Sequence, residues 1–290
     1  MLPEYIDIHG HVNFKAFDDD RDVAIRRALD NKTWIINVGT QADTSKKAVE
    51  IANKYDEGVY AIVGLHPIHT SASYHDEKEL GEGGKEFTSR GEVFNKDVYR
   101  EFLKDPKVVA IGECGLDYFH MDVESIEKQK EAFVAQVELA EEINKPLMLH
   151  IRNNPNNKNI NAYTDVLEIL KKYPKVKGDV HFFAGSMADA KAFLERGFTL
   201  SFTGVITFTH DYDEIIKNTP INMIMSETDS PYVAPVPYRG KRNEPFYVNE
   251  IVKKIAEIKG LSEIETKKAI IANAMRVFLT PSLASDRVDI

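Results

Sequence analysis

Two histidines stand two residues apart where the first apolar run of the chain ends. The run Tyr5–His9 is followed by Gly10 and His11. Because side chains alternate along an extended chain, Asp7, His9 and His11 are expected on one side of it. Two imidazoles so placed form a chelating pair for Zn²⁺ or a similar divalent cation. A pair of hydrogen-bonded turn histidines is the structural alternative, and the spacing alone leaves both open.

A carboxylate follows another apolar run. Glu113 comes directly after Val108–Gly112, and Gly115 lies two residues further on. Where a buried strand gives way to a glycine turn, a carboxylate has to be charged, paired or bound to a ligand. The glycines would let the backbone turn closely beside a metal ion. The adjacent Cys114 is expected to point away from such a site, and nothing marks it as a nucleophile.

Further histidines and acids lie late in other apolar runs. His150 lies near the end of the fifth run and His181 lies in the sixth. A lone histidine in a buried strand is usually a core residue with satisfied hydrogen bonds. Glu227 and Asp229 alternate at the end of the eighth run, which offers one ligand and one acid that orients a ligand. Asp-Ser-Pro at 229–231 also suits a turn.

Short β-rich apolar runs recur eight times, and amphipathic stretches separate most of them. This alternation predicts an α/β protein with a (β/α)8 TIM barrel as a single domain over 1–290, a fold of ~250 residues plus insertions. A doubly wound open sheet is the alternative, but no Gly-rich dinucleotide fingerprint follows the first run. The predicted strands are Tyr5–His9, Trp34–Gly39, Val59–Gly64, Val108–Gly112, Pro146–Ile151, Gly178–Phe183, Phe198–Thr203 and Met223–Thr228.

The helical stretches carry buried positions at steps of three and four residues. The clearest is Ile126–Ile143, where Gln129 and Gln136 recur among apolar residues on one face. The other predicted helices are Asp22–Leu29, Thr44–Tyr55, Tyr163–Tyr173, Ala188–Glu195, Tyr247–Ile258 and Glu263–Phe278.

Three stretches lack this periodicity. Residues 69–95 are rich in Gly, Glu, Ser and Lys and predict a long loop insertion after the third strand. The asparagine-rich stretch Asn153–Asn161 predicts a shorter loop. The tail 281–290 is expected to lie at the surface.

The strand ends together decide between a core and a ligand interpretation. The carboxyl ends of barrel strands meet at one face, where active sites lie. Separate core explanations would have to coincide at five strand ends, whereas one metal cluster explains all of them. Two divalent cations ~3.5–4 Å apart, each with two imidazoles and a carboxylate and sharing one glutamate, would clamp a phosphoryl group and activate water. The predicted ligands are His9, His11, Glu113, His150, His181 and Asp229.

Basic residues near these positions are candidates for phosphate binding. His66 lies just past the third run, where substrate contact and turn packing are alternatives. Arg152 shares the expected face of His150. The loop 237–243 holds an aromatic residue and three cations just beyond Asp229, which favours an anion-binding role over a solvated basic loop. The cations are Arg239, Lys241 and Arg242.

Composition excludes several classes of protein. The net charge of −9 argues against a protein that coats nucleic acid through its overall field. No apolar run is long enough for a transmembrane helix, and the start MLPEYIDIHG lacks the layout of a secretory signal. A single cysteine suits a reducing cytosol, so a cytoplasmic location is expected. Composition does not give the oligomeric state, and a monomer is compatible with it.

Several motifs together resemble the TatD family of metal-dependent deoxyribonucleases, within the amidohydrolase-like barrels. They run nearly end to end: DIHGH at 7–11, GLHP at 64–67, GECGLDYF at 112–119, LHIR at 149–152, HFFAGS at 181–186, ETDSPYVAPVPYRGKRNEP at 227–245 and NAMRVF at 273–278. The resemblance implies the same six ligands and hydrolysis of DNA phosphodiesters, often from the 3′ end, with Mg, Mn or Zn. The stretches after His69 and Arg152 are longer than the family leads one to expect.

The predicted function is therefore hydrolysis of DNA phosphodiester bonds, of the 3′–5′ exonuclease type, with two divalent metal ions. The metals would lower the pKa of a bridging water towards ~7, and the resulting hydroxide would attack phosphorus in line. The predicted catalytic residues are Glu113, which bridges the ions, and Asp229, which takes the proton of the nucleophile. The expected partner is DNA, as a single strand or a 3′ end.

Other functions remain open from the sequence. An ester, lactone or phosphotriester hydrolase on a related barrel often bridges its metals with a carboxylated lysine, and no lysine lies between Ala110 and Leu116. Hydrolysis of an aminoacyl ester on tRNA is a closer alternative, because the same hydroxide could attack a carbonyl. A non-catalytic metal-binding scaffold would be favoured by a missing ligand, yet every ligand position is filled.

Overall fold

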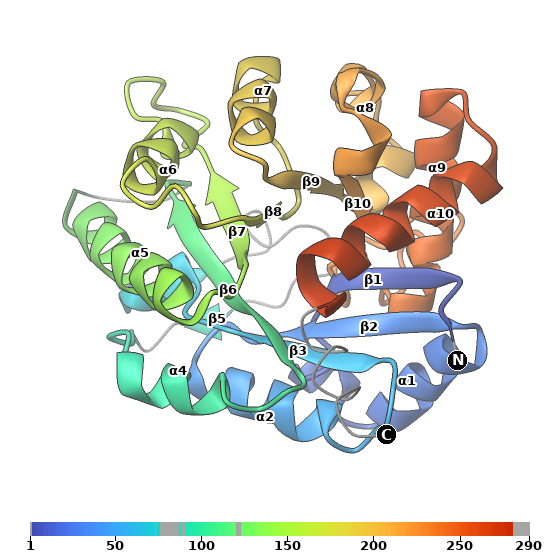
Figure 1. Ribbon diagram of the computed structural model, residues 1–290, viewed down its shortest axis with the longest axis horizontal. Helices are drawn as coiled ribbons and strands as arrows, with labels where there is room; N and C mark the ends of the chain where they lie inside the picture. Colours follow the sequence, from blue (N-terminus) through green and yellow to red (C-terminus); the bar gives the residue numbers. More distant parts are fainter. Residues whose placement is uncertain (1, 73, 76–86, 89–90, 120–122, 281–290) are drawn as a thin grey trace.

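The main sheet of the molecule contains eight parallel strands (Figure 1). The computed structural model describes residues 2–72, 74–75, 87–88, 91–119 and 123–280. The remainder of the predicted 69–95 insertion and the 281–290 tail lie outside the described residues. In spatial order the strands are β1 Tyr5–Gly10, β2 Thr33–Val38, β3 Val59–Val63, β6 Val108–Asp117, β7 Leu147–Arg152, β8 Gly178–Val180, β9 Thr199–Phe202 and β10 Ile224–Ser226.

The two outer strands of this sheet approach each other. Gly10 at the end of β1 forms a parallel bridge with Ser230, just after β10. The sheet therefore curls into a nearly closed barrel, because its first and last strands lie side by side. This confirms the predicted (β/α)8 fold.

Helices surround the barrel on its outer side (Figure 1). Two short ones were not predicted, α4 and α8, because helices of seven and six residues span too few turns to show a period. Within the predicted insertion, β4 Tyr74–His75 pairs antiparallel with β5 Phe87–Thr88. The helices are α1 Arg21–Asp30, α2 Ala42–Ala52, α4 Lys96–Phe102, α5 Val123–Ile143, α6 Ala162–Leu170, α7 Met187–Glu195, α8 Asp213–Asn218, α9 Val248–Lys259 and α10 Glu263–Ala274.

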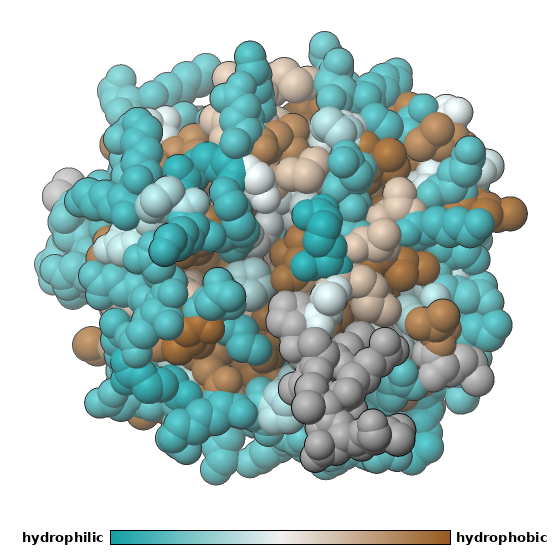
Figure 2. All heavy atoms as spheres, viewed as in Figure 1, coloured by the Kyte–Doolittle hydropathy of each residue, from teal (hydrophilic) through white to brown (hydrophobic). Residues whose placement is uncertain are grey.

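Apolar residues form two buried layers. The larger layer lies between the strands and the helices, and the smaller one fills the barrel. A π-helical turn, Met275–Leu279, follows α10 and brings Phe278 and Leu279 into the smaller layer. Hydrophilic side chains cover most of the face seen in Figure 2. None of the described helices is both long and apolar enough to span a membrane.

Strand β6 differs from its predicted end at Gly112. It continues to Asp117, and its register with β7 shifts between Ile111 and Cys114. Glycine permits this close approach, since a Cβ on Gly115 would lie 2.1 Å from the carbonyl oxygen of His150. The glycines therefore belong to a bulged strand, and Glu113 lies inside it.

Strict alternation also fails in β1. Its register with β2 shifts between Asp7 and Gly10. Ile6 and Ile8 belong to the buried layer inside the barrel. Strict alternation would turn His9 to the opposite face from Ile8, but the side chain of His9 lies 3.3 Å from Glu113. Asp7 is not part of that group, because its carboxylate accepts hydrogen bonds from the backbone N–H and the hydroxyl of Thr228. The expectation that it points with His9 and His11 was wrong.

Candidate metal centre

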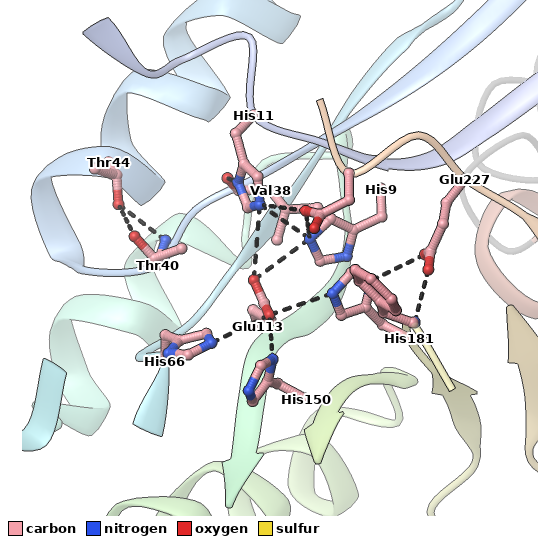
Figure 3. A network of polar contacts seen from close by, with 12 residues as sticks. His9, His11, Val38, Thr40, Thr44, His66, Glu113, His150, His181 and Glu227 are labelled. Carbon is pink, nitrogen blue, oxygen red and sulfur yellow. Dashed lines mark hydrogen bonds and ion pairs between the residues drawn. The ribbon is translucent and has the colours of Figure 1, made fainter. Parts of the chain in front are cut away.

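Five imidazoles surround the carboxylate of Glu113 (Figure 3). Its Oε2 lies 3.3 Å from Nε2 of His9 and 3.8 Å from Nε2 of His11. Its Oε1 lies 3.0 Å from Nδ1 of His150 and 3.5 Å from Nε2 of His181. His66 completes the group, with Nε2 3.2 Å from Oε1. The two oxygens of one buried carboxylate thus face two different sets of imidazoles.

The set on the Oε2 side includes a second carboxylate. Asp229 Oδ1 lies 3.3 Å from Nε2 of His11 and 3.8 Å from Nε2 of His9. Closure of the barrel between β1 and the end of β10 brings these residues together. Nδ1 of His11 lies 2.9 Å from the carbonyl oxygen of Val38. When Nδ1 donates its hydrogen to this oxygen, the lone pair of the neutral imidazole is on Nε2, which faces the acids.

The set on the Oε1 side is supported by two further acids. Asp117 Oδ2 lies 2.7 Å from Nε2 of His150. Glu227 Oε2 lies 3.0 Å from Nδ1 of His181, and its Oε1 accepts a hydrogen bond from the N–H of Phe182. Each histidine therefore presents one nitrogen to Glu113 and the other to an acid, the usual support for a metal-bound imidazole.

Buried negative charge dominates the site. Burial alone would raise the pKa of Glu113, but the surrounding imidazoles hold it well below its usual value. Burial likewise opposes protonation of His150 and His181, yet their acidic partners raise the pKa of His150 to about 9 and of His181 to about 10. Burial lowers the pKa of His9, so that imidazole is neutral. The carboxylates thus favour positive charge at this point.

The donor atoms fit divalent cations. Some of these side chains form groups of three whose donor atoms lie within 4.8 Å of one another. One group is His9, His11 and Asp229, and another is Glu113, His150 and His66. A third such group is His9, His181 and Glu227. Mixed imidazole and carboxylate donors suit Zn²⁺, Mn²⁺ or Mg²⁺. A cation would supply the positive charge that protons on the histidines otherwise provide.

The site is open on one side. The side chains of His150 and Asp229 are 19% and 14% exposed, whereas that of His9 is fully buried. A substrate would therefore approach across His150 and Asp229.

The structure brings together all six residues predicted as ligands, and it places the predicted phosphate contacts less uniformly. His66 contacts Glu113 directly rather than lying at the edge of the site. Arg152, at the end of β7, has its guanidinium 3.8 Å from the ring of Phe119. Arg239 lies over the ring of Phe208 at 3.9 Å. Lys241 is exposed.

The guanidinium of Arg242 binds acidic side chains and an aromatic ring of the protein itself. It makes two hydrogen bonds of 2.7 Å to the carboxylate of Asp20 and one of 3.1 Å to Glu244. It also lies over the ring of Phe17 at 4.2 Å. These contacts hold the 237–243 loop against the segment before α1 and engage the guanidinium of Arg242 within the protein.

Sequence reasoning missed Asp117. The signal was available, since Asp117 lies four residues after Glu113 and an extended β6 would carry both. The predicted end of the strand at Gly112 hid it. Cys114 agrees with its prediction: it is buried among the apolar residues outside the barrel, and its Sγ faces the carbonyl oxygen of Met148 at 3.7 Å.

Comparison with known proteins gives consistent relatives. The family model described as TatD related DNase matches residues 6–279. A metal-dependent hydrolase of Bacillus subtilis strain 168, YabD, is 36% identical over 94% of this chain and 98% of its own length. A Vairimorpha ceranae protein named as a homologue of the deoxyribonuclease TATDN1 is 31% identical over 88% of both chains. The crystal structure of YJJV, a TatD homologue from Escherichia coli K12, superposes with a TM-score of 0.78 at 26% identity, covering 96% of this chain and 99% of the other.

Proposed function

The chain belongs to the family of TatD related DNases, and on that premise we propose that it hydrolyses phosphodiester bonds of DNA with two divalent metal ions. One observation carries the number of ions: the two oxygens of Glu113 face two separate sets of ligands. The first ion would be held by His9, His11 and Asp229, and the second by His150 and His181. Glu113 would bind both.

The ions would lower the pKa of a water molecule and neutralise charge on the phosphoryl group. Glu113 would hold both ions as an ionised carboxylate, because the surrounding imidazoles keep its pKa well below its usual value despite burial. Asp229 is ionised for a related reason: burial raises its pKa, but the hydrogen bond to His11 and the nearby imidazoles lower it further. As the more exposed of the two carboxylates, Asp229 is the one placed to accept the proton of the nucleophile.

Two arginines at the carboxyl end of the barrel supply substrate contacts. Arg152 follows His150 by two residues in β7 and is partly exposed, with its guanidinium over Phe119. Arg239 lies after β10 with its guanidinium over the exposed ring of Phe208. An arginine supported by an aromatic ring can bind a phosphate through its edge while a base stacks nearby. The exposed side chain of Lys241 adds positive charge beside them.

The test is a metal-dependence screen of the whole chain. The protein is stripped with a chelator and reloaded with Mg²⁺, Mn²⁺ or Zn²⁺, and each form is assayed on 3′-labelled single-stranded DNA, duplex DNA, RNA, an aminoacyl-tRNA and a simple phosphodiester. We expect metal-dependent release of the label from the 3′ end of the DNA strand. Absence of DNA cleavage together with release of the amino acid from tRNA would contradict the proposal and favour the ester hydrolase.

Metal content tests the ligand set independently of the substrate. His181→Ala should reduce the bound metal from two equivalents to about one. The matched control is His210→Ala, which removes an imidazole whose side chain is 85% exposed and paired with Asp213. This control should keep two equivalents. Under half an equivalent in the unmodified protein, purified without chelators, would overturn the two-metal proposal.

A further inference from the structure

Helix α5 carries two buried glutamines that bind the backbone of the barrel. Gln129 accepts a hydrogen bond from the N–H of Asp117 at 2.8 Å and donates one to its carbonyl oxygen at 2.8 Å. Gln136 makes the same pair of bonds with Leu65, at 2.9 and 3.0 Å. Both side chains are 1% exposed. Burying an amide in an apolar layer is unfavourable unless it is fully bonded, so each glutamine has a defined partner rather than a solvent role.

The bond from Gln129 fixes a residue that itself contacts the metal centre. Asp117 is 2% exposed. Its Oδ1 accepts a hydrogen bond of 2.9 Å from the N–H of Phe119, and its Oδ2 lies 2.7 Å from Nε2 of His150. The backbone of Asp117 is thus held from α5 and its carboxylate from the following turn. With Oδ1 held in this way, Oδ2 of Asp117 faces His150.

This arrangement selects one tautomer of His150. Oδ1 of Asp117 accepts a hydrogen bond from the backbone N–H of Phe119, and its Oδ2 lies within hydrogen-bond distance of Nε2 of His150; a carboxylate accepts hydrogen bonds rather than donating them. Nε2 of His150 must therefore donate. Nδ1 is then the nitrogen that is available to a cation, and it lies 3.0 Å from Oε1 of Glu113.

We propose that Gln129 and Asp117 are positioning residues that orient His150 for the second metal ion. This inference rests on the proposed function, because it takes His150 as a ligand. The chain of contacts begins outside the barrel, on α5, and ends at the carboxylate that the two ions share. Removing a hydrogen-bonded partner of a metal-binding histidine typically costs 10–100-fold in metal affinity.

The experiment titrates metal-free protein with Zn²⁺ or Mn²⁺ in a calorimeter, with no substrate present. Asp117→Asn keeps the size of the side chain but can donate to Nε2, which would place the proton on Nδ1. We expect one of the two ions to bind ~10–100-fold more weakly and the other to change by less than about 2-fold. Nitrogen-15 NMR of the metal-free protein, recorded at a pH high enough for the imidazoles to be neutral, should show His150 changing from the Nε2–H to the Nδ1–H tautomer.

A matched pair of variants separates positioning from general loosening of the fold. Gln129→Met and Gln136→Met each remove the two hydrogen bonds that a buried amide of α5 makes to the barrel backbone, and each leaves a side chain of similar length. Gln136→Met also removes a bond of 3.2 Å to the carbonyl oxygen of Ala132 within the helix. Both should lower the stability to a similar extent. Gln129→Met should weaken the second ion more than Gln136→Met does. Gln129 bonds the residue that contacts the ligand His150, whereas Gln136 bonds Leu65, whose neighbour His66 contacts Glu113 but is not a proposed ligand.

The outcomes are distinct. Equal loss of affinity in Gln129→Met and Gln136→Met, or equal loss for both ions in Asp117→Asn, would overturn the inference in favour of a purely structural role. Unchanged binding of both ions in Asp117→Asn would overturn it as well. If the unmodified protein fails to bind two ions, the proposed function fails instead. If Asp117→Asn does not fold, the glutamine pair still gives the answer.

Discussion

Replacing Glu113 by glutamine should abolish most of the activity while leaving the fold in place. Glutamine has nearly the same volume but no charge, so the change isolates the electrostatic role of the carboxylate. Glu113 is 4% exposed and faces imidazoles on both of its oxygens. A neutral amide would serve as a poor bridging ligand, and its NH₂ group would point towards a cation or towards a histidine.

The magnitude follows from the distances. Nδ1 of His150, an imidazole whose pKa is raised to about 9 in the metal-free protein, lies 3.0 Å from Oε1. Loss of one charge at about this distance from a unit positive charge costs ~5 kcal/mol at an effective dielectric constant of about 20. At 1.36 kcal/mol per factor of ten, this amounts to roughly 10³-fold or more in kcat/KM. The weakened binding of the ions themselves would add to the loss at low metal concentration.

The assay uses Mn²⁺-loaded protein and a 3′-labelled single-stranded oligonucleotide, with metal content measured on the same samples. Glu131→Gln, on an exposed position of α5, is the matched control because it removes one negative charge far from the imidazoles. It should retain the activity of the unmodified protein. The reasoning is refuted if Glu113→Gln cleaves within about tenfold of the unmodified rate with both ions bound.

Three further predictions concern pH, the core and the arginines. In metal-free protein the hydrogen bonds to Asp117 and Glu113 outweigh burial and raise the pKa of His150 from 6.5 to about 9; its contribution to stability is therefore complete below pH 6.5 and lost as the pH rises through 9. Melting temperatures of chelator-treated protein should fall across this window, while metal affinity rises because the proton no longer competes. Phe278→Ala should cost ~3–5 kcal/mol of unfolding free energy in urea titrations, because it leaves a cavity inside the barrel; a cost under about 1 kcal/mol would contradict the packing described. Arg152→Ala should raise the KM for an oligonucleotide ~10-fold, the loss of one charge-assisted hydrogen bond, whereas Arg242→Ala should lower stability without changing that KM.

The ligand positions could be predicted because the barrel places the carboxyl ends of its strands together. His9 and His11 are far from Asp229 in the sequence, yet any closed barrel brings the first and eighth strand ends side by side. Glu113 was recognised because a carboxylate in a buried apolar context demands a partner. Once the fold class was known, the pattern of residue types was therefore sufficient to predict that these six side chains lie together; their role as ligands stays a prediction.

Other features depended on tertiary contacts that a local pattern does not contain. Asp117 was missed because glycines at 112 and 115 read as a turn, whereas packing against β7 keeps them in the strand. The contacts of Arg242 were not predicted, because its partner Asp20 lies 222 residues away in the sequence. Gln129 and Gln136 appeared as ordinary members of a helical face, and only the packed structure gives them bonding partners.

The bridge between Gly10 and Ser230 joins the first strand of the barrel to the segment after the last strand. The first proposed ion would therefore affect how firmly the barrel closes at this point. Its proposed ligands lie on both sides of this seam, His9 and His11 on the β1 side and Asp229 after β10. An ion bound there would connect the two edges of the sheet where the barrel closes. Like any ligand of the folded state, it would stabilise the closed barrel by a free energy that grows with its concentration relative to its dissociation constant. Backbone amides along the seam should then exchange with solvent faster when the ion is removed, before those of the β6–β7 pair on the far side of the barrel.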